Sequence, residues 1–325
     1  MVYTLENDKL RVRIATMGAE MVSIINKENG KEYLWNAGDA WKRHSPVLFP
    51  IVGGLKDKSY CHNGKYFEMG QHGFARDMNF EMIEKTKTSI VMGLRENAET
   101  LTKFPFSFRL NLSYELEDKK IKVGWKVYNP NDYEMHFSIG GHPAFMCPLG
   151  ADTVTGTVQA GASSTVNSIA TVTESPSAEN SPETTGTVSQ TDCYLHFDEE
   201  GPVSYRFLSP EGLCLPWDLS LPTDGGFVKL GYNFFDNDAY VMYNDRMRTV
   251  SLAGPDKKDY LKVHFDTPVY GIWSAKGKHA PFVCIEPWYG RCDAVNFSGD
   301  WRDREFDNVV SEGEEWNGGY EIEIV

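Results

Sequence analysis

One histidine, His142, stands in a conformationally restricted stretch of chain and could exchange a proton near neutral pH. It lies in Ser-Ile-Gly-Gly-His-Pro, residues 138–143, directly after a run that is typical of a strand. The two glycines let the backbone turn or approach a ligand, and Pro143 restricts His142 to an extended conformation. Imidazole titrates close to neutral pH and therefore suits acid or base catalysis. On this stretch alone, a structural histidine at the rim of a sheet is the simpler interpretation.

A carboxylate, Glu286, could supply the complementary group. It follows the apolar residues 281–285 and precedes Pro287 and Trp288. Apolar and aromatic surroundings remove water from a carboxylate, which raises its pKa and makes it a competent general base. Taken alone, a salt bridge to Arg291 at the rim is an equally good interpretation of Glu286.

Four further side chains could bind a substrate. His72 and Arg76 lie in Gln-His-Gly-Phe-Ala-Arg, residues 71–76, and Arg76 offers five N–H donors to hydroxyl, carboxylate or phosphate groups. Asp238 precedes a strand-like run and could accept hydrogen bonds from sugar hydroxyls. Trp273 could stack on the apolar face of a sugar or belong to the core. For His72, Arg76 and Asp238 taken singly, ordinary structural roles are favoured.

The sequence has no pattern that predicts a metal or a cofactor. The other histidines lack a partner at metal-ligand spacing, and the six cysteines form no Cys-x-x-Cys pair. No phosphate-binding or dinucleotide fingerprint and no Gly-x-Ser-x-Gly motif occurs. We therefore expect neither a catalytic metal nor a cofactor, and acyl, phosphoryl and hydride transfer lose support.

Charge and composition restrict the partners. The 325-residue chain has a formal net charge of −14, which disfavours nucleic acid and anionic membranes as partners. The first residues do not resemble a signal peptide, and no apolar run approaches membrane-spanning length. We expect a cytoplasmic protein with reduced thiols and a small-molecule partner. A monomer and a homodimer both remain open.

Short alternating segments must position these side chains. Apolar residues recur at every second position, most regularly over 106–116, and turn residues separate the segments as in all-β folds. Residues 45–54 contain prolines and glycines and predict a buried loop or edge segment, and 96–103 predicts one short helix. The expected strands are 10–14, 18–25, 31–35, 65–69, 80–84, 88–94, 106–116, 121–128, 135–139, 205–208, 227–230, 239–243, 248–252, 261–265, 270–274, 282–285 and 319–325.

Residues 151–192 differ from the rest of the chain. They are rich in Thr, Ser, Gly and Ala and have almost no large apolar side chain. Such a segment buries too little apolar area to offset its ordering entropy. We expect a surface insertion, with a pair of hairpins as the alternative.

Four motifs together resemble the aldose 1-epimerase (galactose-mutarotase-like) family. They are His-Gly-Phe-Ala-Arg at 72–76, Gly-His-Pro-Ala-Phe at 141–145, Asn-Asp-Ala at 237–239 and Ile-Glu-Pro-Trp at 285–288, in that order. Ser-Pro-Val-Leu-Phe-Pro at 45–50 is most similar to the LacX branch. The resemblance covers 1–325 apart from the insertion.

The resemblance implies a fold and an activity. The fold is a single large antiparallel β-sandwich, or supersandwich, with few short helices. The activity is interconversion of the α and β anomers of a hexose by acid/base ring opening, without a cofactor. His142 corresponds to the general acid, Glu286 to the general base, and His72 and Asp238 to ligands of the sugar hydroxyls. We expect His142 and Glu286 to face each other across a sugar-sized hollow.

One departure from the family pattern leaves alternatives open. Related sequences often carry Arg where this chain has Gly54, so a sugar contact is either missing here or supplied by Arg76 or Lys56. A non-catalytic sugar-binding or sensing protein is one alternative, and a hexose-6-phosphate 1-epimerase with Arg76, Lys56 and Arg43 around the phosphate is another. A glycosidase or lyase would need a second carboxylate, Asp238 or Asp293, to act with Glu286.

Overall fold

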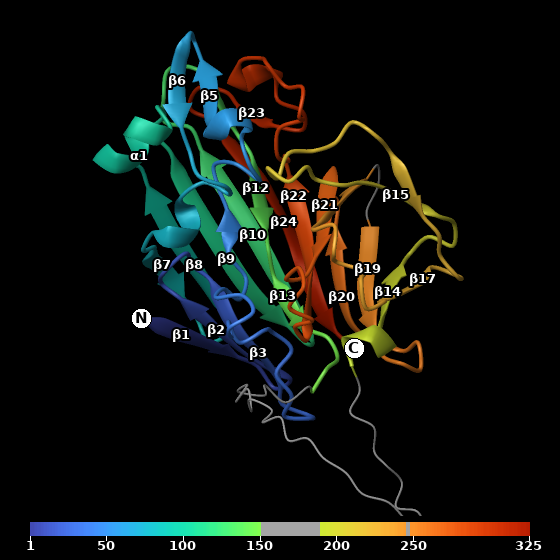
Figure 1. Ribbon diagram of the computed structural model, residues 1–325. Coiled ribbons are helices and arrows are strands. Elements are labelled where there is room, and N and C mark those ends of the chain that lie inside the picture. The colour runs from blue at the N-terminus through green and yellow to red at the C-terminus, as the bar shows by residue number, and fades with distance from the viewer. Residues whose placement is uncertain (151–188, 245–247) are drawn as a thin grey trace, which may run out of the picture.

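Two large antiparallel sheets dominate the computed structural model, which describes residues 1–150, 189–244 and 248–325 (Figure 1). The nine-stranded sheet runs β17 (Phe227–Lys229), β14 (Tyr194–Phe197), β19 (Arg248–Ala253), β20 (Asp259–Phe265), β24 (Glu315–Ile324), β10 (Lys120–Tyr128), β9 (Arg109–Glu117), β8 (Ser89–Arg95) and β7 (Glu81–Lys85). The eight-stranded sheet contains β16 (Leu219–Leu221), β15 (Val203–Arg206), β18 (Tyr240–Tyr243), β21 (Val269–Trp273), β22 (Phe282–Tyr289), β12 (Ile139–Gly141) and β4 (Val47–Leu48), and β13 (Ala144–Met146) also pairs with β22.

Smaller elements border these sheets. β1 (Val2–Glu6), β2 (Leu10–Ala15) and β3 (Met21–Asn26) form a three-stranded sheet. β5 (Ser59–His62) pairs with β6 (Lys65–Glu68), and β11 (Met135–Phe137) with β23 (Asn308–Val310). The helical elements of the described residues are α1 (Ala98–Lys103) and the 3₁₀ turns η1 (Lys56–Lys58), η2 (Ala75–Asp77), η3 (Gln190–Asp192) and η4 (Trp301–Asp303). None of these helices is long and apolar enough to cross a membrane.

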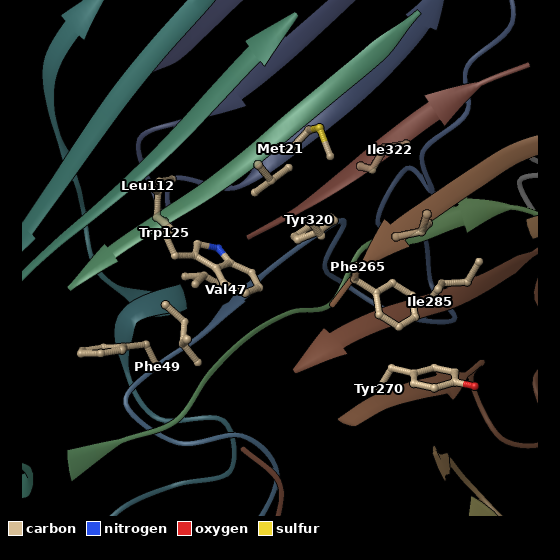
Figure 2. Packing of buried hydrophobic residues seen from close by; sticks show 14 of the residues in the cluster. Met21, Val47, Phe49, Leu112, Trp125, Phe265, Tyr270, Ile285, Tyr320 and Ile322 are labelled. Carbon is tan, nitrogen blue, oxygen red and sulfur yellow. The ribbon is translucent and has the colours of Figure 1, made fainter. Parts of the chain in front are cut away.

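The main core lies between the two large sheets. Figure 2 shows Leu112 of β9 and Trp125 of β10 on one side, and Tyr270 of β21 and Ile285 of β22 on the other. All four side chains are buried. Strands β9 and β10 alternate buried with exposed or half-buried residues, as strands with one covered face should. The predicted all-β sandwich is therefore confirmed.

Strand β22 is buried on both faces. Val283 and Ile285 join the main core, whereas Phe282 and Cys284 belong to a smaller apolar cluster on the opposite face of the sheet. Because side chains alternate along a strand, Glu286 also lies on that second face. The candidate site is built there.

The expected strands are largely confirmed, with differences at 31–35, at 135–139 and, as a third, at the end of 282–285. Residues 31–35 make only isolated bridges, at Glu32 and Leu34. The expected strand 135–139 is divided between β11 and β12, which belong to different sheets. The insertion expected at 151–192 falls outside the described residues except for 189–192. Residues 45–54 contribute only the short strand β4 at the end of its sheet, as the prolines predicted.

The third difference concerns Glu286, which we expected to follow the strand at 282–285. Strand β22 instead continues through Pro287 to Tyr289. Proline cannot donate to a sheet ladder. On one side, β22 pairs with β12 and β13. This pairing is interrupted between Cys284 and Trp288, where β22 has no paired residue on that side. Pro287 therefore lies in a gap of the ladder, where a strand tolerates it.

Candidate active site

The same interruption brings His142 to Glu286. Strand β12 pairs with β22 before the gap and β13 pairs with it after the gap, in one continuous register. When this register is continued through the gap, it places His142 directly opposite Glu286. The residues flanking the gap are paired as Gly140 with Trp288 and Ala144 with Cys284. Cross-strand neighbours have Cβ atoms about 5 Å apart, so their side chains meet.

The two side chains are in contact and almost fully buried. His142 Nε2 lies 3.2 Å from Glu286 Oε2, and the residues are 7% and 1% exposed. They lie side by side, which corrects the expectation that they face each other across a hollow. Glu286 Oε2 nevertheless accepts no hydrogen bond of acceptable geometry among the described residues. One of its lone pairs therefore remains available for another partner.

Burial acts on the protonation of both groups. Burial is the main cause that lowers the pKa of His142 to about 3, and the positive charges of Arg76 and Arg43 contribute to that shift. Burial also raises the pKa of Glu286 well above its ordinary value, with a smaller contribution from the negative charge of Asp238. A neutral imidazole beside a carboxylic acid contains the same number of protons as an imidazolium beside a carboxylate. The pair can therefore pass between these two arrangements by relocating a proton.

A cavity of about 250 Å³ opens onto the pair. All six candidate residues of the sequence analysis line it: His72, Arg76, His142, Asp238, Trp273 and Glu286. They come from β21, β22, η2 and the loops beside β12, β18 and η2. The structure thus brings together four sequence motifs that are far apart along the chain.

His72 is held as a neutral hydrogen-bond donor. Its Nδ1 accepts from the backbone N–H of Gly53 at 3.0 Å, and the backbone N–H of His72 donates to the Gly53 carbonyl at 2.9 Å. Burial lowers the pKa of His72 well below its ordinary value, and nearby His142, Arg76 and Arg43 act in the same direction. With Nδ1 accepting, the ring proton lies on Nε2. That N–H can donate to a ligand oxygen.

Arg76 is the basic residue of the sequence analysis that reaches this cavity. Its Nη2 donates to the Gln71 carbonyl at 2.9 Å, and its buried Nε has no hydrogen-bond acceptor among the described residues. Lys56 Nζ is engaged elsewhere, donating to the Phe297 carbonyl at 2.8 Å. Arg43 forms an ion pair with Asp77 at 2.9 Å.

The loop around Gly212 approaches Gly54. A Cβ added to Gly54 would lie 3.5 Å from the Gly212 carbonyl oxygen. Leu208 and Gly212 themselves line the cavity. At that distance a Cβ would be in ordinary van der Waals contact with the loop, so the local packing does not by itself require glycine at position 54.

Asp238 and Trp273 form a bonded pair on the cavity wall. Trp273 Nε1 donates to Asp238 Oδ1 at 2.7 Å. Asp238 itself has a positive φ of 69°, a conformation that aspartate adopts more readily than most residues. The indole thereby fixes one carboxylate oxygen and leaves Oδ2 for a ligand.

Comparison with known proteins places the chain in a family. Residues 1–322 match the family model for aldose 1-epimerase. The chain belongs to the aldose 1-epimerase family. The resemblance inferred from the four motifs is thereby confirmed.

Relatives of this aldose 1-epimerase family member include two LacX proteins of Lactococcus lactis subsp. lactis, one chromosomal and one plasmid-borne. Each is 30% identical over 300 residues, which cover 89% of this chain and 88% of the relative. A galactose mutarotase related enzyme from Lactobacillus acidophilus is 30% identical, with a TM-score of 0.83 over 100% of this chain and 97% of that one. A galactose mutarotase-like protein from Lactobacillus casei is 28% identical, with a TM-score of 0.82 over the full length of both chains.

Sequence reasoning missed Trp41. In this family member its half-buried indole lies over the His142 imidazole, with ring centroids 4.8 Å apart and an interplanar angle of 27°. It also meets the edge of Trp273 at 5.4 Å. Trp35 Nε1 donates to the Trp41 carbonyl at 2.8 Å, which anchors the loop. An aromatic residue in an irregular loop has no periodicity, so the sequence offered no signal for its position.

The glycines before His142 have a different role from the one we expected. A Cβ on Gly140 would lie 2.5 Å from Trp288 Cδ1, and one on Gly141 would lie 2.8 Å from the ring of Tyr320. Real Cβ atoms do not approach other atoms so closely. Gly140 therefore makes room for a ring of the adjacent strand β22, and Gly141 for a ring of β24 in the other large sheet, and neither serves a turn or a ligand.

Cys284 is a second residue that the sequence analysis did not connect with the site. It precedes Glu286 by two positions on β22, so both side chains lie on the same face. Ligand-type atoms of His142, Cys284 and Glu286 all lie within 4.8 Å of one another. The period-two rule applied to 282–288 would have found this neighbour. All six cysteines are unpaired thiols.

Proposed function

We propose that this protein interconverts the α and β anomers of an aldose. The observation that carries the proposal is the buried contact of His142 with Glu286 at the wall of a cavity of about 250 Å³. That volume lies below the roughly 300–1,000 Å³ of pockets for drug-sized ligands, and it suits a single sugar. Membership of the aldose 1-epimerase family supports the same reaction.

Ring opening would begin with Glu286 as carboxylate and His142 as imidazolium. Glu286 takes the proton of the anomeric hydroxyl, and a C1=O bond forms as the bond between C1 and the ring oxygen breaks. The electron pair of the broken bond stays on the ring oxygen, which takes a proton from His142. The product is an open-chain aldehyde beside a carboxylic acid and a neutral imidazole.

Ring closure then reverses the two roles. After rotation about the C1–C2 bond, the chain hydroxyl attacks the other face of the carbonyl and His142 takes its proton. Glu286 returns its proton to the carbonyl oxygen. The opposite anomer forms and the pair regains its starting protonation.

The contact geometry suits this cycle. The anomeric oxygen and the ring oxygen are bonded to the same carbon, so two catalytic groups side by side can reach both. The pair contains one exchangeable proton throughout, and the neutral arrangement that burial favours is the one needed for closure. Each positioned acid or base contributes roughly 10²–10⁴-fold to a rate.

The surrounding residues would orient the sugar. His72 Nε2–H can donate to a hydroxyl, and Asp238 Oδ2 can accept from one. Trp273, whose indole is bonded to Asp238, can cover an apolar face of the ring. A donor and an acceptor fixed by their own hydrogen bonds favour one orientation of the sugar.

A phosphorylated aldose is the second candidate substrate. Arg76 lines the cavity, and a guanidinium suits phosphate oxygens. A glycosidase has less support, because Asp293 is already bonded to Arg304 at 2.8 Å and the cavity suits one sugar. A non-catalytic sugar-binding protein would share the cavity but not the rate enhancement.

A panel of anomerisation rates tests the proposal. Interconversion of the anomers of glucose, galactose and their 6-phosphates would be followed by proton NMR or polarimetry. We expect at least one sugar to equilibrate well above the buffer rate. Binding by calorimetry without any acceleration would favour the sugar-binding alternative, and release of reducing ends from oligosaccharides would favour a glycosidase.

A further inference from the structure

Three side chains of different chemistry meet beneath the cavity: an imidazole, a thiol and a carboxylate. They belong to His142, Cys284 and Glu286, which are all buried, and their ligand-type atoms lie within 4.8 Å of one another. Cys284 and Glu286 lie on one face of β22, and His142 lies between β12 and β13, opposite Glu286; these strands are labelled in Figure 1. Sheet pairing therefore fixes Cys284 and Glu286 directly, and it fixes His142 through the paired residues Gly140 and Ala144 on either side of it.

The arrangement approaches the geometry of a tetrahedral metal site. Two ligand atoms bound at about 2.0 Å to one tetrahedral zinc ion are about 3.3 Å apart, and His142 Nε2 and Glu286 Oε2 are 3.2 Å apart. A thiolate bound at about 2.3 Å would lie about 3.5 Å from either atom. The Cys284 sulfur would therefore need to move by about 1 Å or somewhat more, which a change of its side-chain torsion can provide.

A second observation also points to a ligand. Glu286 Oε2 is buried and accepts no hydrogen bond of acceptable geometry among the described residues. A buried carboxylate oxygen without a donor is costly, and a bound ion is one of the partners that satisfy such an atom. The free lone pair lies on the same oxygen that is closest to His142.

The donor set selects the kind of ion. Thiolate and imidazole favour soft or borderline cations such as Zn²⁺ and Cd²⁺, whereas Mg²⁺ and Ca²⁺ prefer sites made of oxygen atoms. Three protein ligands and one position open to the cavity match the usual coordination number of four for zinc.

We propose that this protein binds one soft divalent cation through His142 Nε2, Cys284 Sγ and Glu286 Oε2, and that the bound cation blocks the site. The cation occupies the two atoms that would exchange protons with the sugar. Binding of the cation is independent of the proposed function, whereas inhibition by the cation rests on it.

Titration of the full-length, reduced and chelator-treated protein with Cd²⁺ tests the binding. We expect one Cd²⁺ per chain and the ultraviolet charge-transfer absorption of a cadmium–thiolate bond. Cys284→Ser keeps the size of the side chain but replaces the soft sulfur with a hard oxygen, so it should abolish that absorption. It should also weaken Cd²⁺ binding at least ~10-fold, because even the loss of a residue that only supports a metal ligand lowers metal affinity by about that factor. His142→Asn should weaken the same binding event.

Cys61→Ser is the control, because Cys61 is also a free thiol but is not part of the cluster. It should bind Cd²⁺ as the wild type does. Equal Cd²⁺ affinity and absorption in wild type and Cys284→Ser would overturn the proposal, as would the absence of a thiolate band in wild type. Both readouts need no sugar, so their failure leaves the anomerase proposal untouched.

Inhibition is measured separately. If the wild type accelerates anomerisation, Zn²⁺ should suppress the rate, and Cys284→Ser should need at least ~10-fold more Zn²⁺ for the same suppression. Equal sensitivity of the two proteins would contradict the blocking role of the cation. A wild type that binds Cd²⁺ but accelerates no sugar would contradict the proposed function alone.

Discussion

Replacing Trp41 tests whether the ring stacked on His142 supports proton transfer. Its indole lies 4.8 Å from the imidazole, at 27°. The face of an indole attracts a cation by about 0.5–2 kcal/mol, so it stabilises imidazolium more than neutral imidazole. At 1.36 kcal/mol per tenfold change in rate, Trp41→Leu should slow anomerisation roughly 2- to 30-fold.

Trp41→Phe separates this effect from general loss of packing. Phenylalanine keeps an aromatic face over His142, so its rate should stay within about 3-fold of wild type. Trp217→Leu is the control for an indole elsewhere, since Trp217 is 63% exposed and does not line the cavity. Rates would be measured by proton NMR exchange between anomers, with unfolding in urea alongside. Equal losses in Trp41→Leu and Trp41→Phe, or no loss in either, would refute the reasoning.

Two further predictions concern stability. Gly271→Ala should destabilise the fold by about 1–3 kcal/mol, because its Cβ would lie 2.4 Å from Trp288 Cη2; the urea midpoint should fall, whereas Gly70→Ala, with open space around it, should leave it nearly unchanged. Burial acts to raise the pKa of Glu20, but hydrogen bonds from the loop at His44 outweigh it and the pKa lies below 4.5. The stability that Glu20 contributes is therefore present above about pH 4.5 and lost as the pH falls through its folded pKa. The unfolding free energies of wild type and Glu20→Gln should therefore converge in acid. A difference between them that grows in acid would contradict this assignment.

Local pattern was enough to predict most strands of this fold. Residues 106–116 alternate apolar and polar side chains, and β9 buries the same alternate positions at Leu110, Leu112 and Tyr114. Period two is a local property, because it follows from the pleat of one strand. The four motifs likewise identified the family. That the chain folds as one domain stays a prediction.

Contacts set by strand register could not be predicted in the same way. The side-by-side contact of His142 with Glu286 depends on how β12 and β13 pair with β22, which no local pattern specifies. The expectation of an intervening hollow was wrong for that reason. Trp41 reaches the site from an irregular loop, where neither period nor spacing limits its position.

The catalytic roles assigned to residues of the site remain a proposal, and their direct test is the rate of anomer interconversion in wild type, Glu286→Gln and His142→Asn. The matched control is His196→Asn, since His196 forms a similar contact with Asp259, at 2.9 Å, but does not line the cavity.

The account predicts a loss of roughly 10²–10⁴-fold for each change in the His142–Glu286 pair and a wild-type rate for His196→Asn. The double variant should lose little more than either single variant, because the two groups act in one proton transfer. Full activity of Glu286→Gln, on a sugar that the wild type accelerates, would contradict the account.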